Sequence, residues 1–370
     1  MRRIVGGYTH SSQFGKCRLS GFLRIYICRG RQHRNSVVNS KTTDDFTGFF
    51  VYLNAMSSKP PTISQLSPLM PPQTAIAGGH FNAHNPAIEI HRPTTQTVPL
   101  VFASPHSGRV YPDSLIAQSS LAIERLRSSE DAFVDQLFDW VPQFGASQLL
   151  AHFPRVWVDV NRNATEIDAD MFSDNAKLAD PRPSSRVAAG LGVIPKLVGE
   201  GESILPRQLT WAEGQQRLTE CYLPYHRALT ELIAETRARF DMAVIIDCHS
   251  MPSSAAGRSG SGGPDIVLGD GFGDCAAPWL IEQADAAFTA EGLTVRRNYP
   301  YAGGFTTRHY GRPRIGQHAL QIEINRRLYM DEMRITPTAG LDPLRQKLAA
   351  AMQRLVNTLS LLLQADRAAE

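Results

Sequence analysis

The sequence predicts a layered α/β domain, because apolar runs of strand length alternate along the chain with segments of helical spacing. The run Leu320–Asn325 alternates apolar and polar residues as a half-buried strand does, and Ala243–Asp247 is a second apolar run of strand length. Leucines and one methionine recur at helical spacing over residues 344–362. They predict a closing helix with one apolar stripe.

The first predicted strand, residues 98–103, comes before an amphipathic helix from Ser129 to Phe138. A second strand is expected over residues 155–160. The segment that follows, 163–207, is rich in Pro, Gly and Arg and is long for a loop. Such segments typically act as lids or binding loops.

The second half of the chain continues the alternation. Residues Trp211–Phe240 predict a long helix with a break near Pro224, since proline disrupts a helix interior. A short strand is expected at Asp265–Gly269 and a helix over Ala277–Gly292.

The first part of the chain differs in composition from the rest. Residues 1–55 are rich in Arg and Ser, with no acidic residue before Asp44, and a Pro- and Ser-rich stretch follows. An organelle transit peptide has such a composition, but the absence of periodicity and the ordinary opening at Met56 favour upstream sequence outside the fold. We therefore expect a leader and linker over 1–75 and one domain over 76–370.

Charge and cysteine content exclude several classes of protein. The net charge is +3, and the basic excess lies in the leader, so the body lacks the basic cluster of a nucleic-acid surface. No apolar run approaches the roughly 18 residues of a membrane span. The five cysteines form no CxxC pair, which fits a reducing compartment and predicts a cytoplasmic protein.

Chemically capable residues lie at the ends of the predicted strands, and three of them are His106, His249 and Glu323. Open α/β sheets bind ligands at the carboxyl ends of their strands, so we expect these residues to converge on one site. A solitary histidine at such a place is more often structural. Two histidines with a carboxylate favour metal or acid–base chemistry, and zinc hydrolases commonly use such a set.

The spacing alone leaves the third metal ligand open, because the chain contains no HExxH pair. Glu130 and Asp131 are the candidates, although acids in a first helical turn are also expected from the helix dipole. Asp159 and Asp247 lie inside predicted strands and are expected to orient neighbouring groups.

Arg162 and Arg308 are candidates for binding a substrate carboxylate, which a guanidinium can hold with two hydrogen bonds. The alternative for each is a surface ion pair of little energetic weight. The place of Arg162 directly after a strand-end asparagine makes that alternative less attractive. No GxSxG or P-loop motif supports a serine-hydrolase or nucleotide-binding function.

Five segments in order resemble the N-formylglutamate amidohydrolase family, from about Val98 to the closing helix. They are Ser104–Gly108, Val158–Arg162, Asp247–Ser250, Asn298–Gly304 and Gln321–Met330. The resemblance implies a zinc-dependent enzyme that releases formate from N-formyl-L-glutamate in histidine degradation. It also implies a three-layer α/β/α sandwich with a mixed, mostly parallel sheet, similar to that of zinc carboxypeptidases and aspartoacylases.

The resemblance further implies roles for individual residues. His106 and His249 match the ligands of one zinc ion, and Glu323 matches the general base of the zinc carboxypeptidase relatives. Their HxxE glutamate is missing after His106, and order along the chain places Asp131 in that role. Asn161 with the arginine that follows it matches a pair that holds substrate in those relatives.

Two alternatives remain beside the formylglutamate activity. One is a deacylase of another N-acyl amino acid, and the other is a non-catalytic protein that binds acidic amino acids. The presence of His106, His249 and Glu323 together argues against the second. The expected partner is a small-molecule N-acyl amino acid, with no nucleic acid and no membrane.

Overall fold

The computed structural model describes residues 77–79, 81–82, 84–174, 184–199, 201–257 and 263–368, with side chains described as far as residue 361. These residues belong to one compact unit, Gly48–Glu370. The expected leader and linker lie outside the described residues, and the domain bounds stay a prediction.

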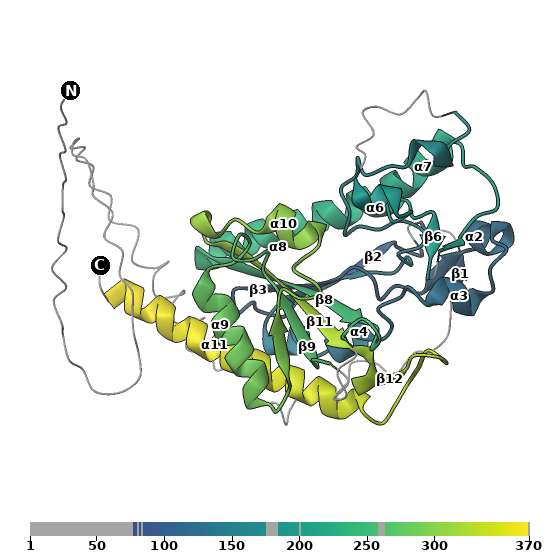
Figure 1. The fold of residues 1–370 in the computed structure, drawn as a ribbon. Helices are drawn as coiled ribbons and strands as arrows, with labels where there is room; N and C mark the ends of the chain where they lie inside the picture. Colours follow the sequence, from purple (N-terminus) through teal and green to yellow (C-terminus); the bar gives the residue numbers. More distant parts are fainter. Residues whose placement is uncertain are drawn as a thin grey trace, which may run out of the picture. The chain divides into compact units, whose positions relative to one another are not determined.

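A seven-stranded sheet with the order β10-β9-β11-β8-β3-β5-β2 forms the centre of the fold (Figure 1). Its strands are β10 (Val295–Arg297), β9 (Ile266–Gly269), β11 (Gln317–Asn325), β8 (Ala243–Met251), β3 (Leu100–Ser104), β5 (Ser147–Ala151) and β2 (Ile88–His91). Most neighbouring strands are parallel, and β11–β9 and β2–β5 are antiparallel. The predicted mixed, mostly parallel sheet is confirmed.

Helices cover both faces of the sheet, because alternate residues of the central strands pack into two separate apolar clusters. Val244 and Ile246 of β8 face α4 (Val134–Leu137), α9 (Pro278–Ala290) and α11 (Leu341–Ala368). Ile245 faces the other way, where α8 (Leu223–Phe240) completes the cover. The three-layer α/β/α sandwich is therefore confirmed, as is the closing helix.

The remaining elements are short and lie mostly in the connections. They are β1 (Ala77–Gly79), β4 (Val110–Pro112), α2 (Asp113–Gln118), α3 (Ile123–Arg127), α5 (Val141–Phe144), η2 (Ala169–Met171), α6 (Ser185–Ala188), β6 (Leu197–Val198), β7 (Glu202–Ser203), α7 (Trp211–Arg217), η4 (Leu218–Tyr222), α10 (Phe305–Tyr310), η5 (Pro313–Ile315), η6 (Arg326–Leu328), β12 (Met330–Asp331) and β13 (Thr336–Pro337). The predicted break near Pro224 is confirmed, because η4 is a turn of π-helix between α7 and α8. No helix within the described ranges has both the length and the apolar character of a membrane span.

The strand expected over residues 155–160 is wrong. The backbone there bonds locally and to a distant loop: Trp157 N donates to Pro154 O, and Asp159 N donates to Val193 O. These bonds take the place of a strand ladder, so the segment is irregular.

The helix expected from Ser129 to Phe138 is also largely wrong, since only α4, one turn long, forms within it. Phe133 has the left-handed conformation, with φ 65°, which a continuous helix does not allow. Asp131 N donates to His106 O at 3.0 Å instead of entering a helix. The residues that looked like a first turn are therefore held against the loop that follows β3.

Candidate functional site

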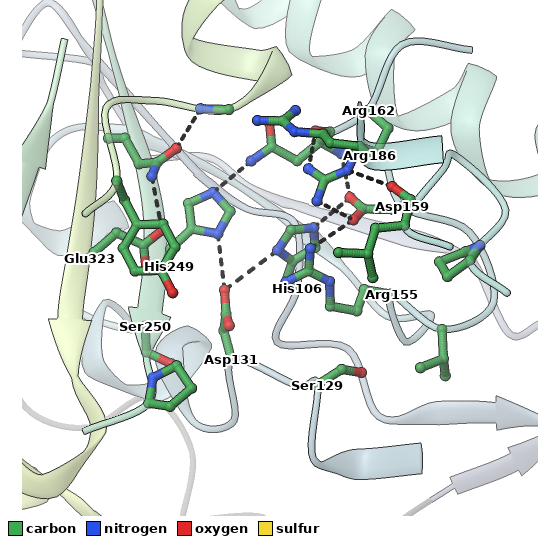
Figure 2. A pocket seen from close by; sticks show the side chains of 18 of the residues that line it. His106, Ser129, Asp131, Arg155, Asp159, Arg162, Arg186, His249, Ser250 and Glu323 are labelled. Atoms are coloured by element: carbon green, nitrogen blue, oxygen red, sulfur yellow. Dashed lines mark hydrogen bonds and ion pairs between the residues drawn. The ribbon is translucent and has the colours of Figure 1, made fainter. Parts of the chain in front are cut away.

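A cavity of about 680 Å³ opens at the carboxyl ends of β3, β8 and β11 (Figure 2). The structure brings every predicted site residue to its wall: His106, Asp131, Asn161, Arg162, His249, Arg308 and Glu323. The convergence follows from the topology, because β3, β8 and β11 are adjacent and parallel, so their ends lie at one edge of the sheet.

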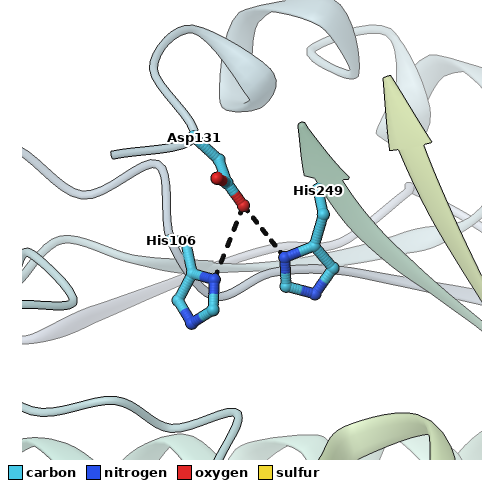
Figure 3. Close-up of side chains that lie close together, drawn as sticks. All are labelled: His106, Asp131 and His249. Carbon is cyan, nitrogen blue, oxygen red and sulfur yellow. Dashed lines mark hydrogen bonds and ion pairs between the residues drawn. The ribbon is translucent and has the colours of Figure 1, made fainter. Parts of the chain in front are cut away.

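His106, Asp131 and His249 form a buried group in this cavity (Figure 3). One carboxylate oxygen of Asp131, Oδ2, lies 2.9 Å from His249 Nδ1 and 3.5 Å from His106 Nδ1. Donor atoms bound to one tetrahedral zinc ion lie about 3.3 Å apart, given metal–ligand distances of about 2.0–2.1 Å. His106 Nδ1 is moreover a buried nitrogen without a hydrogen bond among the described residues. The group therefore fits a metal ion.

Glu130, the other candidate for third ligand, is not part of this group. Its carboxylate accepts from Tyr111 at 2.6 Å and pairs with Arg127 at 3.1 Å. The backbone amide of Asp131 donates to His106 O, and the side chain of Asp131 faces the histidines. The side chain of Glu130 points instead into its ion pair with Arg127. Among the described residues, Asp131 is thus the acid that the fold offers.

Carboxylates lie behind both histidines. His106 Nε2 donates to Asp159 Oδ1 at 2.8 Å, and His249 Nε2 lies 3.1 Å from Asp247 Oδ1. A carboxylate on one ring nitrogen fixes the tautomer and leaves the other nitrogen free for a metal. Both rings accordingly present Nδ1 to the centre of the group. Asp159 and Asp247 were expected from the sequence to orient neighbouring groups, and their positions agree with that expectation.

A second group competes for His249 Nε2. The amide Nδ2 of Asn161 lies 3.2 Å from that nitrogen, an arrangement in which the ring proton sits on Nδ1 and is donated to Asp131. A cation at Nδ1 requires the other tautomer. Asp247 Oδ1 can accept the proton on Nε2 in that tautomer, since it is buried and has no other hydrogen bond in the described part of the chain.

Asp131 and Asp159 are anionic. Burial raises the pKa of Asp131, but His106 and His249 outweigh it and hold the pKa well below its usual range. Burial likewise raises the pKa of Asp159, and Arg155 and Arg162 outweigh it to the same effect. The site thus offers a negatively charged ligand and a negatively charged outer partner to a cation.

Glu323 behaves differently. It is buried on β11, where Gln321 Nε2 donates to its Oε1 at 2.8 Å, and Gln321 in turn accepts from Gly304 N at 2.7 Å. Burial raises the pKa of Glu323 to about 7; the charge of His249 opposes the rise and that of Asp131 adds to it. A carboxyl group with such a pKa can both accept and donate a proton near neutral pH.

Three of the arginines that line the cavity differ in how firmly hydrogen bonds hold them. Arg162 donates to Leu191 O and Asn161 O and lies 3.7 Å from Asp159. Arg308 on α10 has one long hydrogen bond, from Nε to Gly303 O at 3.4 Å. Arg186 on α6 (Figure 2) and Arg308 line the cavity and pair with no carboxylate among the described residues, so both are available to an anionic ligand.

Sequence reasoning gave no role to three residues that the fold places at this site. Arg155 donates to Asp159 at 2.7 Å, Arg326 donates to Asp131 at 3.1 Å, and Gln321 holds Glu323. Gln321 and Arg326 stand two and three residues from Glu323 along the chain. Their closeness to Glu323 in the sequence was the available signal that they belong to the site, but it does not show which residue each of them contacts.

A mixed sheet flanked by helices, with two histidines and a carboxylate at its strand ends, is the arrangement of a metal-dependent hydrolase. The sequence model of the family described as N-formylglutamate amidohydrolase matches residues 98–330. The chain belongs to this family.

Relatives of known name agree. The chain is 31% identical to the N-formylglutamate deformylase of Pseudomonas aeruginosa over 268 residues, which is 71% of this chain and 92% of the relative. The corresponding enzyme of Pseudomonas putida is 28% identical over the same shares. The crystal structure of N-formylglutamate amidohydrolase from Ralstonia eutropha JMP134 superposes with a TM-score of 0.69 at 34% identity, over 76% of this chain and 99% of that one.

Proposed function

We propose that this protein is an N-formylglutamate deformylase, which hydrolyses the formamide bond of N-formyl-L-glutamate to L-glutamate and formate in histidine degradation. One observation carries the proposal: the Nδ1 atoms of His106 and His249 converge on Asp131 Oδ2 in a cavity that also holds Glu323. Relatives that bear this activity in their names match most of the chain.

We assign one Zn²⁺ ion to His106, Asp131 and His249. Two imidazoles and a carboxylate form the ligand set of many catalytic zinc sites, which keep a further position open. When bound, the ion acidifies a water molecule and polarises the carbonyl oxygen of the scissile amide.

Glu323 is the general base. It accepts a proton from the attacking water and then donates that proton to the amine of the departing glutamate. A pKa raised by burial suits both steps, and a cation nearby favours the carboxylate form that the first step needs. The Gln321 amide keeps the carboxylate oriented throughout.

The substrate is held by Asn161, Arg162 and Arg308. N-formylglutamate has two carboxylates, and two arginines that line the cavity come from different elements: Arg162 from the loop before η2, and Arg308 from α10. Arg186 is a further cation for the same purpose. The side chain of Asn161 accepts from Thr306 N at 2.8 Å, which connects the loop of Arg162 to the helix of Arg308.

The test is formate release from N-formyl-L-glutamate by the purified chain, with and without a zinc chelator. We expect turnover to stop with chelator and to return with added Zn²⁺. His249→Ala should bind Zn²⁺ more than about a hundredfold more weakly, since it removes a ligand rather than an outer partner. His152→Ala, outside the cavity and paired with Glu89, is the matched control and should bind zinc normally.

A panel of N-acyl amino acids decides between the proposal and its alternatives. Faster turnover of acetyl or longer acyl substrates would favour a different deacylase, for which a cavity of about 680 Å³ has room. If the chain binds glutamate tightly but shows no metal-dependent turnover, a non-catalytic binding protein is favoured. The cytoplasmic location expected from the cysteines stays a prediction.

A further inference from the structure

Arg326 is a buried arginine that directly follows β11, the strand of Glu323. It begins η6, whose capping residue Asn325 accepts from Arg327 N at 3.3 Å and donates to Pro264 O at 3.0 Å. Only 7% of Arg326 is exposed. The turn is therefore anchored on both sides, and the side chain of Arg326 starts from a fixed backbone.

All three nitrogens of the Arg326 guanidinium donate to protein oxygens. Nε donates to Ser250 Oγ at 3.1 Å, Nη1 to Ser128 O at 3.3 Å and Nη2 to Asp131 Oδ1 at 3.1 Å. The three acceptors belong to β8, to the end of α3 and to the loop of Asp131. This guanidinium is consequently fixed in one orientation, unlike that of Arg308, which has one long hydrogen bond.

The contact with Arg326 gives the two carboxylate oxygens of Asp131 different partners. Oδ1 is held by Arg326, while Oδ2 lies 2.9 Å from His249 Nδ1 and 3.5 Å from His106 Nδ1. Figure 3 shows one oxygen facing both rings and the other turned away from them. A carboxylate can bind a metal through one oxygen or both, and here a charged hydrogen bond occupies one of them.

We propose that Arg326 is a positioning residue that holds Oδ1 of Asp131 and so leaves Oδ2 as the single oxygen offered to a cation between His106 and His249. The inference rests on the metal site of the proposed function. One oxygen and two nitrogens fill three positions of a tetrahedron and leave a fourth open, as in catalytic zinc sites. A second oxygen would favour cations that prefer more oxygen ligands, such as Mn²⁺.

The competing explanation is that Arg326 only balances the charge of a buried carboxylate. In that case its removal lowers stability, because an uncompensated charge stays buried, but it leaves the metal coordination unchanged. Coordination number and metal preference therefore separate the two explanations, whereas activity or stability alone does not.

The experiment compares the wild-type chain with Arg326→Met and Arg326→Lys. Co²⁺ is the spectroscopic probe, because four-coordinate Co²⁺ absorbs visible light strongly and higher-coordinate Co²⁺ absorbs weakly. The affinities for Zn²⁺ and Mn²⁺ are measured by competition with a chelating dye, and their ratio cancels any general loss of affinity.

We expect the wild-type chain and Arg326→Lys to give strong cobalt absorption, since a lysine ammonium can still donate a hydrogen bond to Asp131 Oδ1. Arg326→Met should give weak absorption, and its preference for Zn²⁺ over Mn²⁺ should fall by about tenfold, the scale of effect that outer partners have on metal sites. An unchanged spectrum and ratio in Arg326→Met would overturn the inference. A wild-type chain that binds no zinc would instead refute the metal site of the proposed function.

A crystal structure of the zinc-bound wild-type protein tests the same point if Arg326→Met does not fold. The inference requires Asp131 Oδ1 to stay on Arg326 with Oδ2 alone on the metal. Two oxygens of Asp131 at bonding distance from zinc would contradict it.

Discussion

Glu323 lies directly opposite His249 in the parallel register of β11 and β8. Residues paired in this way on neighbouring strands project from the same face of the sheet. The backbone ladder therefore places the proposed base beside a proposed metal ligand without help from a loop. That arrangement keeps the two groups together even if the loops around the cavity move.

The first prediction concerns Glu323→Gln. The amide has the same shape as the carboxyl group but cannot take a proton from water, so kcat should fall by about 10²- to 10⁴-fold while zinc content stays normal. Steady-state kinetics and metal analysis measure the two quantities. Glu282→Gln, at an exposed site on α9, is the matched control. A kcat near that of the wild type would remove Glu323 from the mechanism.

The second prediction concerns the partner behind His106. Asp159→Asn keeps the shape of the side chain but removes the charge that stabilises the imidazole–metal unit and balances Arg155. Zinc affinity should fall by about tenfold or more. Competition with a chelator measures it, and Asp285→Asn, at a surface ion pair with Arg297, should leave it unchanged. Equal zinc affinity in both variants would show that Asp159 does not support the site.

The third prediction concerns substrate charge. Arg308→Ala should raise KM for N-formyl-L-glutamate by about ten- to a hundredfold, because a hydrogen-bonded ion pair with a substrate carboxylate is lost. The preference for N-formylglutamate over N-formylglutamine, whose side chain carries no charge, should narrow in parallel. Arg314→Ala, an exposed site on η5, serves as control. If the preference for the diacid survives in Arg308→Ala, another cation recognises the side chain.

The fourth prediction concerns pH and stability through His226. This histidine on α8 lies between Val160 O and Tyr310 Oη, 2.9 Å from each, and burial lowers its pKa to about 4. The unfolded chain takes up a proton there below about pH 6.5, whereas the folded protein does so only near pH 4. The free energy of unfolding should therefore fall as pH decreases from about 6.5 to 4, by at most about 3 kcal/mol from this group.

Urea denaturation at pH 7 and pH 4.5 tests this contribution. His226→Gln cannot titrate, so its stability should change less between the two pH values than that of the wild type. His84→Gln, which removes an exposed histidine, should show the wild-type difference. Equal pH dependence in all three proteins would contradict the prediction.

The alternation of apolar runs with helical spacing was enough to predict the layered α/β fold, its central strands and the closing helix. These features depend on periodicity that is local in the chain, and the clusters on both faces of β8 follow it residue by residue. His106, His249 and Glu323 were also found this way. Their strands are adjacent and parallel, so their carboxyl ends converge for any sequence with that sheet order.

Tertiary contacts alone decided the rest. The run at residues 155–160 has strand-like composition, yet its amides bond to Pro154 and to Val193, far along the chain, so no strand forms. Asp131 faces the histidines with its amide bonded to His106 O, whereas Glu130 is held by Tyr111 and Arg127. Arg326 meets Asp131 only because the end of β11 passes the loop of Asp131 in space. Sequence periodicity specifies which face a residue takes within its own element, whereas a hydrogen bond between distant segments depends on where the whole fold places both partners.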